Sequence, residues 1–349
     1  MTIERIFASR LTAPVVFVAL CFIPTIADPY IQYLVNLVLA YIVVAIGQMI
    51  VLGFAGQFAF ANAAFMGIGA YTVALLTSRV GVSFWIALPV AGALCALLGG
   101  IVGLPALRIS RVYLSIVTLA FGEMVTWVFL YWKSVTRGTN GAKVIRPDTF
   151  GIDFRSDTAI FYVVLIVTAL LTIAARQLLA SRYGRAFVSI RENELVARCN
   201  GINVPLYKTL AFTISAFYAG IGGGLFAFAL GFIVPYGFGM LQLVLHFAIV
   251  MVGGLGYLSG AILGAIVLTV LPEVLRGVQA AQEITYGALL MLFIVFMPRG
   301  LAGMLIDRRI LPPEVLVQGW RQEIGHGGVI TEHEAKARAV AANEEARAR

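Results

Sequence analysis

The sequence predicts an all-α protein built as a bundle of transmembrane helices, and two observations carry this prediction. Of the 349 residues, 60% are hydrophobic and only 12% are charged, whereas about a quarter of the residues in a soluble domain are charged. Long stretches also carry no charge, the two longest being residues 29–78 and 209–272. A helix needs roughly 20 apolar residues to cross the hydrocarbon, so each stretch holds at least two spans.

The apolar stretches are continuous and do not alternate with a period of two, which favours helices over a β-barrel. We expect about ten spans, at residues 11–28, 31–52, 58–78, 82–106, 112–132, 159–175, 209–230, 241–257, 259–272 and 284–298. The first has the basic start of a signal peptide, but no small-x-small cleavage site stands out, so we expect an uncleaved helix. The ninth is short for a crossing and could be re-entrant.

The distribution of basic residues predicts that both termini are cytoplasmic. With this orientation, and without the tail after Ile310, the inside segments carry thirteen lysines and arginines against seven outside, as the positive-inside rule requires. We therefore expect a transmembrane domain over residues 1–310. The tail, residues 311–349, is rich in alanine, glutamate and arginine, which is typical of a disordered segment or a solvated helix.

Two polar loops interrupt the predicted spans. The outside loop, residues 133–158, has mixed charge and the turn cluster Gly138-Thr-Asn-Gly141. The inside loop, residues 176–208, is basic. Within it Ser189-Ile-Arg-Glu192 matches a capping box, and Asn200-Gly201 matches a helix stop, so we expect a helix over residues 190–200. A helix this short is marginal in water, and either a partner protein or the lipid headgroups could stabilise it.

A few polar side chains stand inside the predicted spans. Glu123 lies in an otherwise apolar span, where an ionisable group is costly and usually faces protein or a water-filled cavity. It could line a substrate or proton path, or form a hydrogen bond between helices. Gln57 and Asn62 could line a pathway or bridge helices, and His246 is expected to be a satisfied interior histidine.

Glycines recur at helical spacing in several spans. Gly256, Gly260 and Gly264 repeat every four residues, which predicts one helix face that allows close packing. The cluster Gly220–Gly224 predicts close packing in another span, and its density also suggests a flexible or broken helix.

Several functions lack their usual sequence features. No phosphate-binding loop is present, and no constellation of serine, cysteine or histidine suggests nucleophilic catalysis, so an enzyme is not expected. Three scattered cysteines and three scattered histidines give no disulfide or metal pattern. Aspartates dilute the basic residues of the outside loop, so nucleic-acid binding has no support.

Several stretches match, in order, the signature of one transporter family. The first is Gly53-Phe-Ala-Gly-Gln-Phe-Ala-Phe-Ala-Asn-Ala-Ala-Phe-Met-Gly-Ile-Gly-Ala-Tyr71. The others are Tyr113-Leu-Ser-Ile-Val-Thr-Leu-Ala-Phe-Gly-Glu123, Arg137-Gly-Thr-Asn-Gly141, Ser181-Arg-Tyr-Gly-Arg-Ala186, Ile190-Arg-Glu-Asn-Glu194, Gly201-Ile-Asn-Val204, Val252-Gly-Gly-Leu-Gly256 and Pro298-Arg-Gly-Leu301. In this combination the chain resembles permeases of the branched-chain amino-acid ABC importers, the LivM type in particular.

The resemblance implies that the helix of the inside loop is the coupling helix that docks on an ATPase subunit. The motif of that helix would fall at Leu195-Val-Ala197 with Gly201 following, although Leu195 and Val196 depart from the usual Glu-Ala. The implied ATPase-coupling residues are Arg191, Glu192, Glu194, Ala197 and Gly201. The candidate substrate-pathway residues are Gln57, Asn62 and Glu123.

The resemblance also implies the partners and the mechanism. The partners would be a homologous LivH-type permease, two ATPase subunits that use ATP and Mg²⁺, and a periplasmic solute-binding protein that faces Thr139, Asn140 and Gly141. The chain itself would hold no cofactor and would lie in a bacterial inner membrane, working by alternating access. Alternatives are a permease of the same type for urea or another small polar solute, a secondary transporter that uses Glu123, or a channel.

Overall fold

The computed structural model describes residues 28–104, 111–145, 148–149, 152–153, 157–274 and 300–307, with single positions at 21, 24, 287 and 291. The predicted first and tenth spans lie almost wholly outside the described residues, as does the tail. Contacts divide the chain into units 1–312 and 313–349, and every described residue belongs to the first. The number of spans and the cytoplasmic position of both termini therefore stay predictions.

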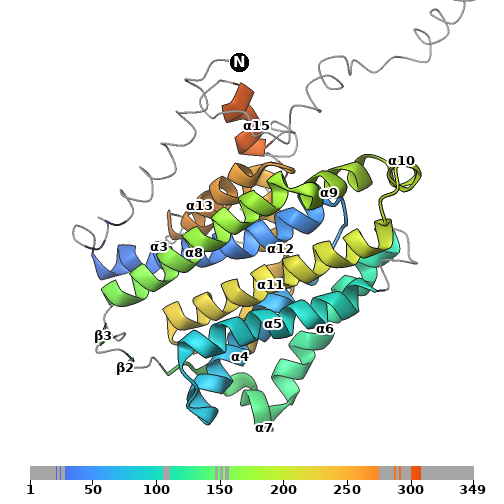
Figure 1. The fold of residues 1–349 in the computed structure, drawn as a ribbon. Helices are drawn as coiled ribbons and strands as arrows, with labels where there is room; N and C mark the ends of the chain where they lie inside the picture. The colour runs from blue at the N-terminus through green and yellow to red at the C-terminus, as the bar shows by residue number, and fades with distance from the viewer. Residues whose placement is uncertain are drawn as a thin grey trace, which may run out of the picture. The chain divides into compact units, whose positions relative to one another are not determined.

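The all-α prediction is confirmed, because long apolar helices dominate the described residues (Figure 1). The helices are α3 (Pro29–Gln48), η1 (Met49–Phe54), α4 (Asn62–Leu75), η2 (Leu76–Val80), α5 (Phe84–Gly103), α6 (Arg111–Tyr131), α7 (Lys133–Thr136), η4 (Gly138–Asn140), α8 (Asp157–Ala180), α9 (Arg182–Glu192), α10 (Glu194–Cys199), α11 (Val204–Leu230), η5 (Pro235–Phe238), α12 (Met240–Gly253), α13 (Leu258–Val274) and α15 (Gly300–Asp307). The strands are β1 (Ala142–Lys143), β2 (Asp148–Thr149), β3 (Ile152–Asp153) and β4 (Phe232–Ile233).

Seven of the described helices are long and apolar enough to cross a membrane. They are α3 with η1, α4 with η2, α5, α6, α8, α11, and η5 with α12. They overlap the second to eighth predicted spans. Around the inside loop the helices are longer than predicted: α8 continues to Ala180 and α11 already begins at Val204, because a helix can extend past the apolar stretch that the hydrocarbon requires. Helix α13, with 17 residues, corresponds to the short ninth segment.

Helix α11 packs against α3, α4 and α5, and the glycine cluster Gly220–Gly224 makes this possible. A Cβ at Gly223 would overlap the carbonyl of Met66 in α4, and one at Gly222 would overlap the Val44 side chain of α3. The helix continues through the cluster without a break. The expectation of a broken helix there is wrong, because packing on three sides holds the glycine-rich turns in helical geometry.

Two short pairs of strands lie at the outside loop. Strand β1 pairs antiparallel with β4, which follows α11, and β2 pairs antiparallel with β3. The first pair joins the loop between α6 and α8 to the connection between α11 and α12.

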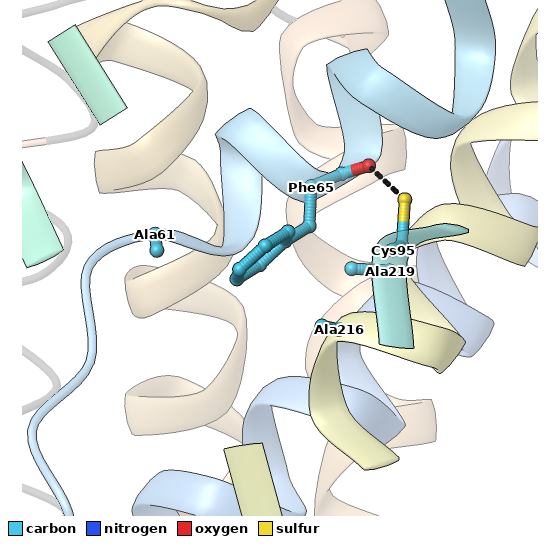
Figure 2. Packing of buried hydrophobic residues seen from close by; sticks show 5 residues of the cluster. All are labelled: Ala61, Phe65, Cys95, Ala216 and Ala219. Atoms are coloured by element: carbon cyan, nitrogen blue, oxygen red, sulfur yellow. Dashed lines mark hydrogen bonds between the residues drawn. The ribbon is translucent and has the colours of Figure 1, made fainter. Parts of the chain in front are cut away.

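A small apolar cluster joins the start of α4 to α5 and α11 (Figure 2). Its buried members are Ala61, Phe65, Cys95, Ala216 and Ala219. The Cys95 thiol donates a hydrogen bond of 3.4 Å to the Phe65 carbonyl oxygen. Two alanines on α11 and a cysteine on α5 are small enough to let the start of α4 lie close to both helices.

We expect the substitution Gly223→Val to destabilise the protein strongly, because the new side chain would overlap backbone atoms of α4 that cannot move away. Thermal unfolding in detergent, followed by size-exclusion chromatography, measures the effect. Gly122→Ala in α6 is the matched control, because its Cβ would lie 3.6 Å from the Phe60 carbonyl oxygen, an ordinary contact. Equal melting temperatures for Gly223→Val and the wild type would contradict the packing described here.

Candidate functional site

The chain between α3 and α4 forms a break in helical structure. Helix α3 widens into the π-helical segment η1, residues 55–61 are not helical, and α4 begins at Asn62. The Asn62 side-chain nitrogen donates a hydrogen bond of 3.3 Å to the carbonyl of Val44, which lies ten residues before the end of η1. Helix α4 therefore begins beside the interior of the α3 span. Non-helical backbone at this depth must be buried in protein or line a cavity.

Side chains satisfy part of the backbone of residues 55–61. The Gln48 side-chain nitrogen donates to the Ala59 carbonyl at 2.9 Å, and the Phe60 amide donates to the Thr118 hydroxyl of α6 at 3.0 Å. Gln57, which is also buried, folds back and donates to the Ala55 carbonyl at 3.2 Å. The structure thus places Gln57 within this segment and Asn62 directly after it, as the first residue of α4.

Sequence reasoning missed Gln48 and Thr118 as members of this site. An amide within a long apolar stretch is the signal that marks Gln48, as it marked Gln57 and Asn62. Thr118 carried no such signal, because threonine hydroxyls in membrane helices commonly bond to their own helix, as Thr118 also does to Leu114.

Glu123 is exposed on α6. This helix lies next to residues 55–61, the non-helical stretch that is called the broken segment below. Helix α6 contacts that segment through Thr118 and also through Gly122, whose backbone lies close to the Phe60 carbonyl. Among the described residues, no partner of the Glu123 carboxylate is found. A carboxylate on the surface of a membrane helix cannot remain in contact with lipid at low cost.

His246 is buried in α12 beside α3. Its Nε2 lies 2.9 Å from the Gln242 side-chain nitrogen, which in turn donates to the Tyr41 hydroxyl at 3.1 Å. The Nδ1 atom has no partner among the described residues. The expectation of a satisfied histidine thus holds for one ring nitrogen only.

The inside loop forms two helices where the sequence predicted one over residues 190–200. Ser189 lies within α9, which continues to Glu192, so the predicted capping box is wrong. Asn193 is the N-cap of α10, because its Oδ1 accepts hydrogen bonds from the Leu195 amide at 2.9 Å and the Val196 amide at 3.2 Å. The sequence does contain the correct signal, because Asn193 followed by the acidic Glu194 is also typical of a helix start. The Ser-x-x-Glu pattern, four residues earlier, was chosen in its place.

The end of α10 follows the prediction, with Gly201 in the left-handed conformation at φ +76°. Ala197 is buried against Ile190 and Val204, so it joins α9, α10 and α11 and does not face outward. Leu195 and Val196 point the other way and are 70% and 53% exposed. The pair gives this six-residue helix an exposed apolar surface, which a partner protein or the lipid headgroups can cover.

Two further residues of this loop have defined partners. Glu194 forms an ion pair of 2.7 Å with Lys208 at the start of α11, and Lys208 is buried. The pair connects α10 to a long membrane helix. Glu192 is exposed.

Arg191 connects the inside loop to the membrane core. Its Nη1 donates a hydrogen bond to the carbonyl of Gly53, at the end of η1. Its side chain also lies against Gly56 and Gly256, where any Cβ would contact it. Arg191 therefore contacts the broken segment on one side and the turn between α12 and α13 on the other.

The three glycines predicted to share one helix face do not all lie on a helix. Gly256 lies in the turn before α13, at φ +85°, so its place on the predicted face is wrong. Gly260 and Gly264 lie in α13 and face the backbone of α12, where a Cβ at either position would overlap carbonyl atoms. The four-residue spacing did not reveal the turn, because glycine is used both for close packing of helices and for turns with a positive φ.

The outside loop presents Thr139 and Asn140 at its surface. Gly141 is buried, and a Cβ there would overlap the Ile233 carbonyl of β4. Its predicted place among the residues that face a binding protein is therefore wrong. It is a structural glycine at φ +69° that allows β1 to pair with β4.

No group of three histidine, cysteine or acidic residues that could hold a metal ion occurs among the residues described. In the same part of the chain, the three cysteines are free thiols.

Comparison with known proteins identifies relatives along most of the chain. Residues 30–297 match the family model described as the permease component of the branched-chain amino acid transport system. The chain is 35% identical to the high-affinity branched-chain amino acid transport system permease protein LivM of Escherichia coli K12, over 77% of this chain and 69% of the relative. It is 28% identical to the LivH permease protein of Salmonella typhimurium, over 75% of this chain and 91% of the relative. No solved structure matches the chain.

We expect Asn193→Ala to loosen α10, because the substitution removes the acceptor for two free backbone amides. An N-cap is worth about 1 kcal/mol, so the amides of residues 195 and 196 should exchange hydrogen about fivefold faster. Hydrogen exchange with mass spectrometry in detergent measures this. Asn193→Asp keeps an acceptor and should exchange like the wild type. Slow exchange in Asn193→Ala would show that the cap is dispensable.

Proposed function

Because this chain belongs to the permease family of the branched-chain amino-acid ABC transporters, and is a multi-pass membrane subunit of the LivM type, we propose that it moves branched-chain amino acids into a bacterial cell. In this proposal it lies in the inner membrane and forms the transport pathway together with a homologous LivH-type permease. The similarity of the chain to both LivM and LivH relatives supports such a pair. The energy comes from two separate ATPase subunits that bind ATP and Mg²⁺.

The observation that carries the proposal is the exposed pair Leu195 and Val196 on the capped helix α10. An ATPase subunit provides a cleft that covers these side chains, and the neighbouring Glu192 lies at the rim. Ala197 and Gly201 act indirectly, because the first fixes α10 on α9 and α11 and the second ends the helix. Lys208 and Glu194 hold α10 to α11.

Movement of the ATPase subunits reaches the membrane through Arg191. When α10 shifts, α9 shifts with it, since the two helices are joined at Asn193 and share the cluster of Ile190, Ala197 and Val204. Arg191 at the end of α9 then displaces the Gly53 carbonyl and with it the broken segment. Alternating access follows when this segment opens toward one side and closes toward the other.

On the outside, Thr139 and Asn140 face a solute-binding protein that delivers the amino acid. The β1–β4 pair connects this surface to the end of α11 and the start of α12. The α6 surface that carries Glu123 faces the partner permease, because the bilayer cannot cover a carboxylate at low cost. Glu123, Gln57 and Asn62 thereby lie along or beside the shared pathway.

We expect the double substitution Leu195→Asp and Val196→Asp to prevent ATPase subunits from co-purifying with the permease pair, because two charges would replace the apolar contact. Pull-down from membranes that express all subunits measures this. Ile145→Asp on the outside loop is the matched control, since Ile145 is also half exposed, at 50%. Normal recovery of the ATPase subunits with the double variant would refute docking through α10.

We expect Arg191→Ala to separate ATP hydrolysis from transport. The exposed pair of α10 is untouched, so the ATPase subunits should still bind, but the contact with the Gly53 carbonyl is lost. Uptake of labelled leucine by proteoliposomes should fall at least about tenfold while ATP hydrolysis persists, a loss equivalent to about 1.4 kcal/mol of coupling. Arg198→Ala, an exposed arginine of the same loop, should leave both unchanged. Full uptake by Arg191→Ala would contradict the role of this link.

A further inference from the structure

The start of α4 has buried backbone donors without partners. Ala61 is its N-cap and provides no side-chain cap. Among the described residues, the backbone N–H groups of Asn62, Ala63 and Ala64 find no acceptor, and the first amide with a partner is that of Phe65, which donates to the Ala61 carbonyl. Residues 61–64 are all buried. A buried helix start without partners is unusual, and its positive dipole end favours an anion.

Two buried acceptors without partners lie beside these donors. The amide oxygens of Gln48 and Asn62, Oε1 and Oδ1, have no hydrogen-bond partner, although the two residues are only 2% and 4% exposed. Each amide is held in place by its nitrogen, Gln48 on the Ala59 carbonyl and Asn62 on the Val44 carbonyl. Rotating either amide by 180° would place its oxygen against a carbonyl oxygen, so the oxygens are the free ends.

The two amides are neighbours. Gln48 and Val44 are one helical turn apart on the same face of α3. The Asn62 amide is bound at the Val44 carbonyl, and the Gln48 amide is bound at Ala59, two residues before the N-cap of α4. The residues that carry the unpaired donors and the unpaired acceptors therefore lie on adjoining buried stretches, at the start of α4 and on the turn of α3 bound to it.

We propose that this place binds the charged head group of an α-amino acid, an assignment that rests on the transport function proposed above. The substrate carboxylate accepts hydrogen bonds from the amides at the start of α4, as anions do at helix starts. The substrate ammonium group, with three donors, binds the amide oxygens of Gln48 and Asn62. Neutral amides hold the ammonium group less tightly than carboxylates would, which suits a site that must release its ligand.

The proposed head-group site is connected to the coupling segment. Residues 55–61 carry the Ala59 carbonyl that holds Gln48, and they also carry Gly56, which contacts Arg191. A shift of Arg191 is therefore transmitted along a few residues to the Gln48 amide. Substrate affinity would then change with the state of the ATPase subunits.

The test measures binding of tritiated leucine to the purified complex of both permeases and the ATPase subunits, without the binding protein. Competitors are unlabelled leucine, 4-methylpentanoate, which lacks the ammonium group, and isopentylamine, which lacks the carboxylate. We expect each analogue to compete at least about tenfold more weakly than leucine, because hydrogen bonds to a charged group contribute about 1.5–3 kcal/mol. Gln48→Met and Asn62→Ala should each lower leucine affinity by about tenfold or more.

The matched control is Gln32→Met. Gln32 is also a buried amide of α3, and its side chain donates to the Pro24 carbonyl. It lies 16 residues before Gln48, about 24 Å along the helix axis. This variant should bind leucine like the wild type. Co-purification of the subunits shows that each variant is assembled.

The outcomes separate the two proposals. If the wild-type complex with its binding protein shows no ATP-dependent leucine uptake in proteoliposomes, the proposed function fails. If uptake is normal but the complex retains no leucine, or both site variants bind leucine as the wild type does, the head-group site is overturned. Competition by 4-methylpentanoate equal to that by leucine would overturn the role of the two amide oxygens. Equal competition by isopentylamine would overturn the role of the α4 start.

Discussion

Water is absent from the hydrocarbon interior, so backbone N–H and C=O groups at that depth must find partners within the protein or line an enclosed cavity. Most of this chain meets the requirement by forming long helices, and the rest of the structure follows from how those helices pack. The glycine cluster of α11 lets its backbone approach α3, α4 and α5 closely. Where the helical pattern stops, at residues 55–61, side chains from α3 and α6 take over part of the hydrogen bonding.

The break in helical structure between α3 and α4 is contacted from several sides by other parts of the chain. Its near end, Gly53, accepts a hydrogen bond from Arg191, and its far end leads into α4, whose first residues pack on α5 and α11 (Figure 2). Between these ends, Gln48 and Thr118 hold individual backbone groups. Arg191 and the start of α4 are thus connected by a short stretch of chain that helical hydrogen bonds do not stiffen.

Helices α9 and α10 of the inside loop combine a fixed side with an exposed side. Ala197, Ile190 and Val204 form the fixed side, and the Glu194–Lys208 ion pair adds a polar contact next to it. Leu195 and Val196 form the exposed side. In the proposed mechanism this division lets a docking partner bind α10 while α10 stays attached to α9 and α11, so that a movement of α10 also moves the attached helices.

The sequence by itself determined that the chain lies in a bilayer, that it is helical, where seven of its spans lie, and which loop carries the short capped segment. These features depend on local composition and on the positions of charges, which the bilayer selects directly. It also marked Gln57 and Asn62 as candidate residues of a pathway, and the family resemblance added Arg191 as a candidate coupling residue. The residues that contact them in space could not be predicted from the sequence.

Only the tertiary structure decided which residues meet. Arg191 reaches a carbonyl 138 residues earlier in the chain, Thr118 reaches an amide 58 residues away, and Ala197 turns inward while Leu195 and Val196 turn outward. The sequence patterns misplaced the start of the short helix in the inside loop and put Gly256 on a helix, because several local structures satisfy a capping pattern or a glycine spacing. Packing between distant segments selects one of these local structures, and the hydropathy of the sequence does not show which one.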